Sequence, residues 1–293
     1  MLDSKNTGKI FCWYGGKGVL FKKILEYLDV EHDVYVEPYC GGASIFFKKK
    51  PSKIEVLNDI DKDIFNFFNV MKNKETYEKL IEMLEWTLYS REEFRRAIEI
   101  CKQEVCEDNV LRAWAFFVGQ NMVFSGKDIR QSGENNWSRS FKRNKPATFR
   151  NKVLNLDWFA ERLRNAFIDC IDGLECIKYW DTEKTLFYID PPYIADTRKD
   201  KNVYKHETDI EHHRKLVDLV LGLKGSFVIS GYEHDIYNKL LENGWQKVEI
   251  STSCFAAGRT RMSNLIGENA AEKYVARKEI LYLNTSKKIK TLL

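Results

Sequence analysis

The segment Thr185-Leu-Phe-Tyr-Ile189, followed directly by Asp190-Pro191-Pro192-Tyr193, indicates the fold more clearly than any other part of the sequence. The first five residues are apolar or favour β-structure, so they predict a buried strand. The two prolines remove backbone N–H donors and stiffen the turn, so the sheet cannot continue past them. A carboxylate, free carbonyl oxygens and an aromatic ring are therefore expected at the carboxyl end of a strand, where open α/β sheets bind ligands. Such groups suit a flat base with an exocyclic amine.

The composition predicts a soluble globular protein. The chain has 293 residues, of which 44% are apolar and 31% charged, enough for one large α/β domain or a domain with a sizeable insertion. No apolar run approaches the ~18 residues of a membrane span, and the first residues lack the layout of a secretion signal. Seven cysteines without a Cys-x-x-Cys pair, and five histidines without zinc-binding spacing, predict a cytoplasmic protein with no metal site.

Positive charge is concentrated between residues 127 and 152. Eight basic residues stand there against two acidic ones, whereas the net charge of the whole chain is only +4. Aromatic, Ser and Asn residues are interleaved with them. Lys and Arg neutralise phosphates, while aromatic and amide side chains stack on bases or bond to them. A solvated surface loop is the alternative explanation, but beside an amine-binding turn we favour nucleic-acid binding.

The apolar pattern predicts an α/β sheet interrupted by a helical and basic insertion. Strands are predicted at 34–36, 54–57, 167–169, 186–189 and 226–230, antiparallel strands between 245 and 283, and helices at 19–28, 158–166 and 212–223. Further helices are predicted at 76–86, 90–102 and 110–123, the second with Ser90 and Glu93 as a capping box. One domain would thus comprise residues 1–65 and 156–293, and the inserted domain residues 66–155.

The first α/β unit has features typical of a nucleoside site. The strand at 34–36 runs into a turn rich in small residues, 37–44, and then into apolar residues 45–47, which we expect to begin a helix. Small residues let the backbone approach a ligand, and helix N–H groups point at it. Asp59 lies 20 residues past Tyr39, the offset at which an acid holds ribose hydroxyls. An ordinary turn and a surface acid are the alternatives.

Two phosphate-binding patterns are missing from the sequence. The G-x-G-x-x-G fingerprint is absent, and Lys17 is followed by Gly18, not by the Ser or Thr of a phosphate loop. A nucleoside without phosphates fits both absences. S-adenosylmethionine is such a molecule.

The order of these motifs resembles that of the α-group, or D12-class, DNA adenine-N6 methyltransferases, the Dam-like enzymes. The matching segments are Trp13-Tyr14-Gly15-Gly16-Lys17 for W-x-G-G-K, Glu37-Pro38-Tyr39-Cys40-Gly41-Gly42 for E-P-F-x-G-G, Asn58-Asp59-Ile60 for the D-I-N region, Asp172 for the acid before the catalytic strand, and Asp190 to Tyr193 for D-P-P-Y. Further matches are Asn121 to Gly126 for N-x-x-F-x-G at the head of the recognition region, Ser230-Gly231-Tyr232 for S-x-Y, and Glu279 to Asn284 for E-x-L-x-x-N. Two residues depart from the family's F-x-G-x-G, in which Tyr39 replaces the Phe and Ala43 the last glycine.

The resemblance implies a Rossmann-like, S-adenosylmethionine-dependent methyltransferase sheet in residues 1–65 and 156–293, with a helical DNA-recognition insertion at 66–155. It implies methyl transfer from S-adenosylmethionine to the N6 amine of a flipped adenine in a specific duplex DNA sequence. The carboxylate of Asp190 and the carbonyl of Pro191 would accept the two hydrogens of the amine, and Tyr193 would stack on the base. The partner is double-stranded DNA, in a bacterial or phage-infected cell, in a setting such as restriction–modification. No oligomeric state is indicated.

The implied site residues fall into three groups. The catalytic residues are Asp190, Pro191, Pro192 and Tyr193. The cofactor-binding residues are Trp13, Lys17, Glu37, Pro38, Tyr39, Cys40, Gly41, Gly42, Ala43, Ser44, Asp59, Asp172 and Asp190, with Asp59 on the ribose and Asp172 on the adenine of the cofactor. The DNA-binding residues are Asn121, Ser125, Lys127, Arg130, Asn135, Asn136, Trp137, Arg139, Lys142 and Arg143.

Several alternatives stay open at the level of sequence. Lys17 could be a surface lysine, and Asp172 a turn acid before Gly173. His213 is expected to be a residue at the start of a helix rather than a catalyst. The same chemistry could act on cytosine N4, an RNA base or a protein glutamine. Other possibilities are a non-catalytic DNA-binding protein with a methyltransferase fold and a nucleotide-binding enzyme of unrelated chemistry.

Overall fold

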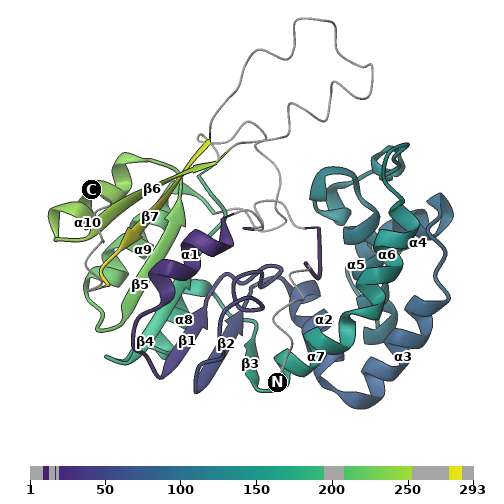
Figure 1. Cartoon of the computed structure of the whole chain (residues 1–293), viewed down its shortest axis with the longest axis horizontal. Coiled ribbons are helices and arrows are strands. Elements are labelled where there is room, and N and C mark those ends of the chain that lie inside the picture. The colour runs from purple at the N-terminus through teal and green to yellow at the C-terminus, as the bar shows by residue number, and fades with distance from the viewer. Residues whose placement is uncertain (1–8, 13–16, 18–19, 195–207, 253–276, 286–293) are drawn as a thin grey trace, which may run out of the picture.

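The computed structural model describes residues 9–12, 17, 20–194, 208–252 and 277–285. Within these residues, seven strands form one sheet in the order β3-β2-β1-β4-β5-β7-β6 (Figure 1). The strands are β1 (Val34–Glu37), β2 (Ile54–Asn58), β3 (Ala166–Asp169), β4 (Thr185–Ile189), β5 (Ser226–Gly231), β6 (Gln246–Thr252) and β7 (Arg277–Leu283). Neighbouring strands are parallel from β3 to β5, and β7 is antiparallel to both β5 and β6. The strand predictions are therefore confirmed, including the antiparallel end of the chain.

Helices cover both faces of the sheet, which explains why its central strands are mostly apolar. All five residues of β4 are buried. Alternate strand residues, such as Tyr35 and Val36, pack into different cores. The first core includes α1 (Phe21–Leu28), α2 (Lys62–Lys72) and α7 (Leu156–Leu163), and the second α8 (Gly173–Tyr179), α9 (Ile210–Leu221) and α10 (Asn238–Glu242).

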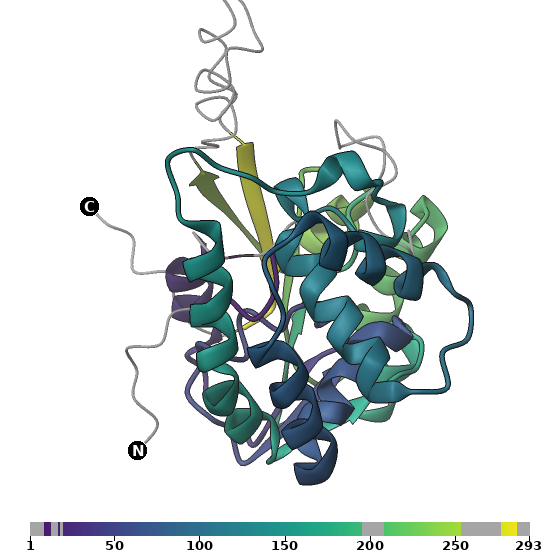
Figure 2. The same cartoon turned by 90° about the vertical axis from the view of Figure 1, so that its right-hand side faces the viewer.

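A helical lobe lies beside β3, at the edge of the sheet (Figure 1), and faces the viewer in Figure 2. Besides α2 and α7, it contains α3 (Lys74–Glu85), α4 (Arg91–Lys102), α5 (Asn109–Met122), α6 (Lys145–Leu154) and short 3-10 turns at Phe124–Gly126, Ile129–Gln131 and Glu134–Asn136. Ser90 caps α4 by accepting a hydrogen bond from the Glu93 backbone N–H, at 3.1 Å, as its sequence predicts. These helices span residues 62–163, whereas the insertion was predicted at 66–155, so α2 and α7 cross its predicted limits.

The apolar residues 45–47 form turns and not the predicted start of a helix. Ala43, two residues before Ile45, has a φ of +48°, a left-handed conformation that cannot form part of a right-handed helix. All three apolar side chains are buried, whereas a surface helix buries only one face. This prediction was wrong because burial on all sides, and not helical amphipathicity, produced the apolar run.

Candidate active site at the carboxyl end of the sheet

The turns after β1 and β4 lie at the same edge of the sheet, because these two parallel strands are neighbours. The strand order reverses there: the chain continues from β1 to β2 on one side and from β4 to β5 on the other. Ligands of open α/β sheets bind at such a switch point. The structure therefore brings the glycine-containing turn at 38–44 and the Asp190–Tyr193 turn together at the place where a ligand is expected.

A buried cluster of charges, formed by Lys17, Asp190 and Glu279, holds the end of β4. The Lys17 Nζ lies 2.8 Å from the Asp190 Oδ1 and 2.9 Å from the Glu279 Oε1. Only 4% of the Lys17 side chain is exposed, so the alternative of a surface lysine is wrong. Glu279 lies on β7, far away in the sequence. We refer to these three residues as the Lys17 cluster.

The charges of the Lys17 cluster depend on one another. Burial raises the pKa of Asp190 to about 6, although the neighbouring ammonium of Lys17 opposes the rise. Burial by itself lowers the pKa of Lys17, but the carboxylates of Asp190 and Glu279 raise it above its ordinary value. Glu279 is buried as well, yet Lys17 holds its pKa below the usual value. At neutral pH the cluster thus contains one cation and two carboxylates.

Tyr193 is held by its hydroxyl group. The hydroxyl donates to the Glu279 carboxylate and accepts from the Lys17 ammonium. The Ser230 hydroxyl donates to the same Glu279 oxygen, at 2.7 Å. The Tyr193 ring packs edge-to-face against Tyr232, with 4.7 Å between the ring centroids. Ser230 and Glu279 were noticed in the sequence only as parts of motifs, and no site role was predicted for them.

The Pro192 carbonyl oxygen is fixed by two donors. The Thr208 hydroxyl donates to it at 2.6 Å, and the His213 Nε2 lies 3.1 Å away. Because a carbonyl only accepts, Nε2 carries the proton, and Nδ1 accepts from the Tyr237 hydroxyl at 2.8 Å. Burial lowers the pKa of His213 to about 4, so the ring stays neutral and orients the turn.

Asp59 supports the turn after β1. Its Oδ2 accepts a hydrogen bond of 2.8 Å from the backbone N–H of Gly41, which has a φ of +48°. Its Oδ1 accepts one of 3.0 Å from the backbone N–H of Asp61. Burial, together with the like charge of Asp61, raises the pKa of Asp59 to about 7. The role predicted for Asp59, holding the ribose of a cofactor, stays a prediction; in this structure its carboxylate accepts two backbone N–H groups.

The fully buried Asn58 joins the turns after three strands. Its Nδ2 donates to the carbonyl oxygens of Pro38, at 2.9 Å, and Ile171, at 3.0 Å. Its Oδ1 accepts from the Ile171 backbone N–H at 3.0 Å. No site role was predicted for Asn58. The available signal was its position, directly after a buried strand and before Asp59.

The carboxylates of two other predicted cofactor-binding residues, Asp172 and Glu37, accept hydrogen bonds from groups of the protein itself. Asp172 caps α8, and its Oδ1 accepts from the backbone N–H groups of Leu174 and Glu175. These contacts are those of the turn acid considered as an alternative. Glu37 is buried, accepts the Tyr35 hydroxyl at 2.8 Å, and has a pKa raised by burial to about 8. Trp13 lies outside the described residues.

Tyr39 connects the turn after β1 to two helices. Its hydroxyl lies 2.8 Å from the Nε2 of His212 on α9. Its ring packs directly on Gly173 at the start of α8, where an added Cβ would lie only 2.3 Å from a ring carbon. The glycine is therefore required by close packing, and the ring of Tyr39 is held in place. Cys40 and Ala43, in the same turn, are also buried.

The predicted DNA-binding residues divide by exposure. The exposed residues are Asn135, Arg139, Lys142 and Arg143, and the half-buried residues are Lys127, Asn136 and Trp137. The Trp137 ring packs against Tyr89 and beneath the Arg91 guanidinium. The Ser125 side chain lies outside the described part of the structure.

The predictions for Asn121 and Arg130 were wrong. The Asn121 Nδ2 donates to the backbone carbonyls of Ile10 and Phe117, and its Oδ1 accepts from Lys152. Only 7% of the Arg130 side chain is exposed, and its guanidinium is bound by three carboxylates. Neither side chain can reach DNA, because its polar atoms are already used inside the protein.

The described residues contain no helix long and apolar enough to cross a membrane. They also contain no group of three or more His, Cys, Asp or Glu side chains placed to hold a metal ion.

The seven-stranded sheet with helices on both faces is consistent with the fold of S-adenosylmethionine-dependent methyltransferases. The model of the D12 class N6 adenine-specific DNA methyltransferases matches residues 13–253, and the chain belongs to this family. It is 27% identical over 182 residues to a DNA adenine methylase of Vibrio cholerae serotype O1, covering 62% of this chain and 63% of the relative.

Two further relatives are also named as a methyltransferase or a methylase. The type II methyltransferase M1.LlaDCHI of Lactococcus lactis subsp. cremoris is 28% identical over 196 residues, 62% of this chain and 64% of the relative. A DNA adenine methylase of Haemophilus influenzae is 23% identical over 282 residues, 89% of this chain and 93% of the relative. The chain thus spans under two thirds of the length of the Vibrio and Lactococcus proteins and most of the Haemophilus protein.

Proposed function

We propose that this protein transfers a methyl group from S-adenosylmethionine to the N6 amine of an adenine in double-stranded DNA. The observation that carries the proposal is the Lys17 cluster at the end of β4, in a chain of the D12 family. The cluster presents an acidic acceptor beside two proline carbonyls at the switch point of the sheet. The likeness to a type II methyltransferase extends the proposal to restriction–modification, in the cytoplasm of a bacterial or phage-infected cell.

In the proposed reaction, Asp190 and the carbonyl of Pro191 accept the two hydrogens of the adenine amine. These contacts draw the nitrogen lone pair out of conjugation and aim it, so catalysis rests on orientation and electrostatics. The bound cofactor supplies an electrophilic methyl group on a sulfonium sulfur. The nitrogen forms a bond to the methyl carbon, the carbon–sulfur bond breaks, and the amine loses a proton. With a pKa of about 6, Asp190 is ionised at neutral pH and can accept that proton.

The turns after β1 and β2 fit a nucleoside that lacks phosphates. Gly41 opens the turn at a positive φ, and Asp59 presents a carboxylate beside its N–H. We propose that Asp59 holds the ribose, that Asp172 holds the adenine, and that Lys17 and residues 37–44, together with Trp13, surround the rest of the cofactor. Carboxylate and backbone groups suit hydroxyl and amine donors, whereas a phosphate would need cations or a row of N–H groups.

DNA would contact the exposed part of the basic segment. The guanidinium and ammonium groups of Arg139, Lys142 and Arg143 are exposed and suit phosphate oxygens. The neighbouring Asn135, Asn136 and Lys127 are candidates for base or phosphate contacts. The target adenine must leave the duplex to reach Asp190, as in other enzymes that modify a base. Residues 66–155 would then form the target-recognition domain and the rest the catalytic domain.

The test is methyl transfer from isotopically labelled S-adenosylmethionine to unmethylated duplex DNA, with the product nucleosides identified by mass spectrometry. We expect labelled N6-methyladenine. Label on cytosine, or on RNA offered in parallel, would contradict the assignment of the target base while keeping the chemistry. Absence of label on all substrates, with binding of cofactor and DNA both verified, would overturn the proposed activity in favour of a non-catalytic DNA-binding protein.

A further inference from the structure

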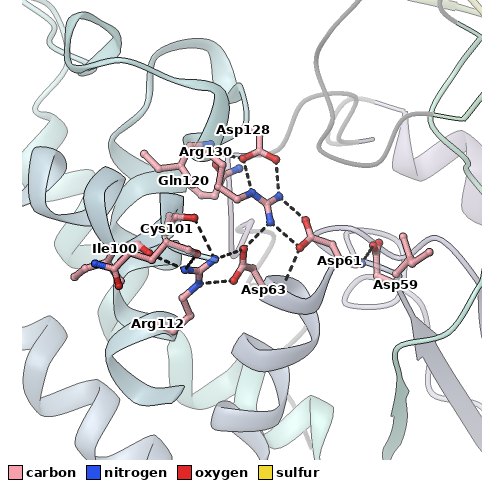
Figure 3. Close-up of polar contacts among 12 residues, drawn as sticks. Asp59, Asp61, Asp63, Ile100, Cys101, Arg112, Gln120, Asp128 and Arg130 are labelled. Carbon is pink, nitrogen blue, oxygen red and sulfur yellow. Dashed lines mark hydrogen bonds and ion pairs between the residues drawn. The ribbon is translucent and has the colours of Figure 1, made fainter. Parts of the chain in front are cut away.

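A second buried cluster of charges joins the helical lobe to the sheet (Figure 3). It consists of Arg112, Arg130, Asp61, Asp63 and Asp128, and we call it the Arg130 cluster. The Arg130 Nη1 lies 2.7 Å from the Asp61 Oδ1 and 2.6 Å from the Asp63 Oδ2, while its Nε lies 2.8 Å from the Asp128 Oδ1. Its Nη2 donates to Asp61 and Asp128. A planar guanidinium with all its edges bound fixes the geometry of three carboxylates.

On one side, the Arg130 cluster leads to the proposed cofactor acid. Asp61 caps α2, and its backbone N–H donates to the Asp59 Oδ1 at 3.0 Å. The other oxygen of Asp59 accepts from Gly41 at 2.8 Å. A continuous chain of hydrogen bonds thus runs from Arg130 through Asp61 and Asp59 to the turn after β1, and Figure 3 shows its first steps.

On the other side, the cluster fixes the start of the basic segment. The Asp128 Oδ1 accepts the backbone N–H of Arg130 at 2.8 Å, and the Ile129 N–H donates to the Gln120 Oε1 on α5 at 2.7 Å. Ile129 sits directly on Gly119, where an added Cβ would lie 2.4 Å from it. Residues 128–132 are therefore held against α5, and Lys127 and Asn135, on either side, are proposed DNA contacts.

We propose that Arg130 is a positioning residue that ties the DNA-contacting segment to Asp59, so that binding of DNA and binding of the cofactor strengthen each other. The inference rests on the proposed function. It assigns Arg130 a positioning role, which the number of basic residues in its segment does not indicate. Without its guanidinium, Asp61 and Asp128 lose their shared cation, so both Asp59 and residues 128–132 lose a support.

Arg112 provides a matched control. It is also buried and also bidentate, with its Nε and Nη2 at 2.6 and 3.1 Å from the two oxygens of Asp63. Its remaining N–H groups donate to the backbone carbonyls of Ile100, Cys101 and Gln103 at the end of α4. Arg112 shares Asp63 with Arg130, but within the described residues its N–H groups donate to neither Asp61 nor Asp128. Arg130 reaches Asp59 and residues 128–132 through these two acids, so the loss of Arg112 should weaken the fold more than it changes the Asp59 turn.

The experiment measures the dissociation constant of S-adenosylhomocysteine by calorimetry, with and without saturating fragments of unmethylated DNA, well below the melting temperature of each variant. For the wild-type chain we expect DNA to tighten the analogue about 5- to 150-fold, the usual range of coupling between sites. In Arg130→Gln this factor should fall towards one, and the affinity of the analogue alone should fall as well. Arg112→Gln should lower the melting temperature but keep both values within about twofold of wild type.

Asp61→Asn is the second variant, because Asn retains the cap of α2 while weakening the pair with Arg130. It should lower the coupling factor in the same direction, and it decides the matter if Arg130→Gln does not fold. Undiminished coupling in the folded variants, equal loss of coupling in Arg112→Gln, or an uncoupled wild-type chain would overturn the inference. A wild-type chain that binds neither ligand would instead contradict the proposed function.

Discussion

The Lys17 cluster and the Arg130 cluster are both buried groups of charges near the carboxyl end of the sheet, yet they are built differently. In the first, one ammonium serves two carboxylates, and 22% of the Asp190 side chain remains exposed. In the second, guanidinium forks bind carboxylates that are 3 to 6% exposed. A lysine is a point charge that can change partners, whereas a fully bound arginine fork fixes geometry.

This difference separates a reacting site from a scaffold. A partly exposed carboxylate that is paired with a single ammonium can exchange that partner for the amine of a ligand. A carboxylate enclosed by arginine forks cannot do so without losing several charge-assisted hydrogen bonds, which contribute more than neutral ones. Buried charge alone therefore does not identify an active site, and the type of cation and the exposure of the acid must be considered with it.

The largest effect is expected for Asp190→Asn, which keeps the shape of the side chain and removes its charge. The single-turnover rate of methyl transfer should fall about 10²- to 10³-fold, the usual cost of losing one electrostatic group in an active site. The matched control is Asp181→Asn, since Asp181 accepts the backbone N–H groups of Lys224 and Gly225 near the opposite end of β4. A control variant that loses as much activity would break the comparison.

Replacing Lys17 should shift the pH dependence of the methylation rate. Methylation requires ionised Asp190, whose pKa of about 6 places the acid limb of the rate near pH 6. Lys17→Met removes the cation that opposes protonation, so the pKa rises and the limb moves to higher pH. The rate at pH 7 should then fall about tenfold for each unit by which that pKa exceeds 7, and recover in more alkaline buffer. Lys17→Arg should keep the limb near its wild-type position, and an unmoved limb in the Met variant would contradict the assignment.

Replacing exposed cations of the basic segment should affect DNA binding directly, whereas Arg130 is proposed to act by positioning other residues. Replacing Arg139, Lys142 and Arg143 by Ala should weaken DNA binding and reduce the dependence of log K on log salt by about 0.9 for each phosphate that is no longer neutralised. Fluorescence anisotropy at several salt concentrations measures both quantities. The exposed pair Lys22 and Lys23 on α1, replaced by Ala, is the control. An equal change of slope in the control would show that net charge alone accounts for binding.

The smallest effect concerns the backbone of the turn that Asp59 supports. Ala43→Gly relieves a left-handed conformation that costs about 1–2 kcal/mol, and this offsets the lost methyl group and the greater freedom of the unfolded chain. The free energy of unfolding should change by less than about 1 kcal/mol. Ala97→Gly, at an equally buried position within α4, should cost about 2 kcal/mol. Urea unfolding of both variants checks this, and equal losses would refute it.

The sequence predicted the elements that depend on local pattern. Apolar runs identified β4 and its neighbours, Ser90 marked the start of α4, and the prolines after Asp190 marked the end of a strand. These signals lie within a few residues of one another, so they need no knowledge of the fold. The same strands also led to the prediction that the site lies at their carboxyl ends.

Pairing between distant charges could not be predicted in this way. Nothing near Lys17 points to Glu279 as its partner, and Arg130 counts as one more cation in a basic segment until Asp61 and Asp63 are placed beside it. Periodicity specifies which face of an element is buried but not which element covers it. The roles of Asn58 and Ser230 were missed for the same reason.

The most direct test of the comparison measures two quantities in Asp190→Asn and Arg130→Gln: the single-turnover methylation rate at saturating cofactor and DNA, and the dissociation constant of S-adenosylhomocysteine. We expect Asp190→Asn to lose far more of the rate than of the affinity, and Arg130→Gln to lose affinity while its saturated rate is largely kept. A saturated rate that falls as far in Arg130→Gln as in Asp190→Asn, or near-normal methylation by Asp190→Asn, would contradict the division between a reacting cluster and a positioning cluster.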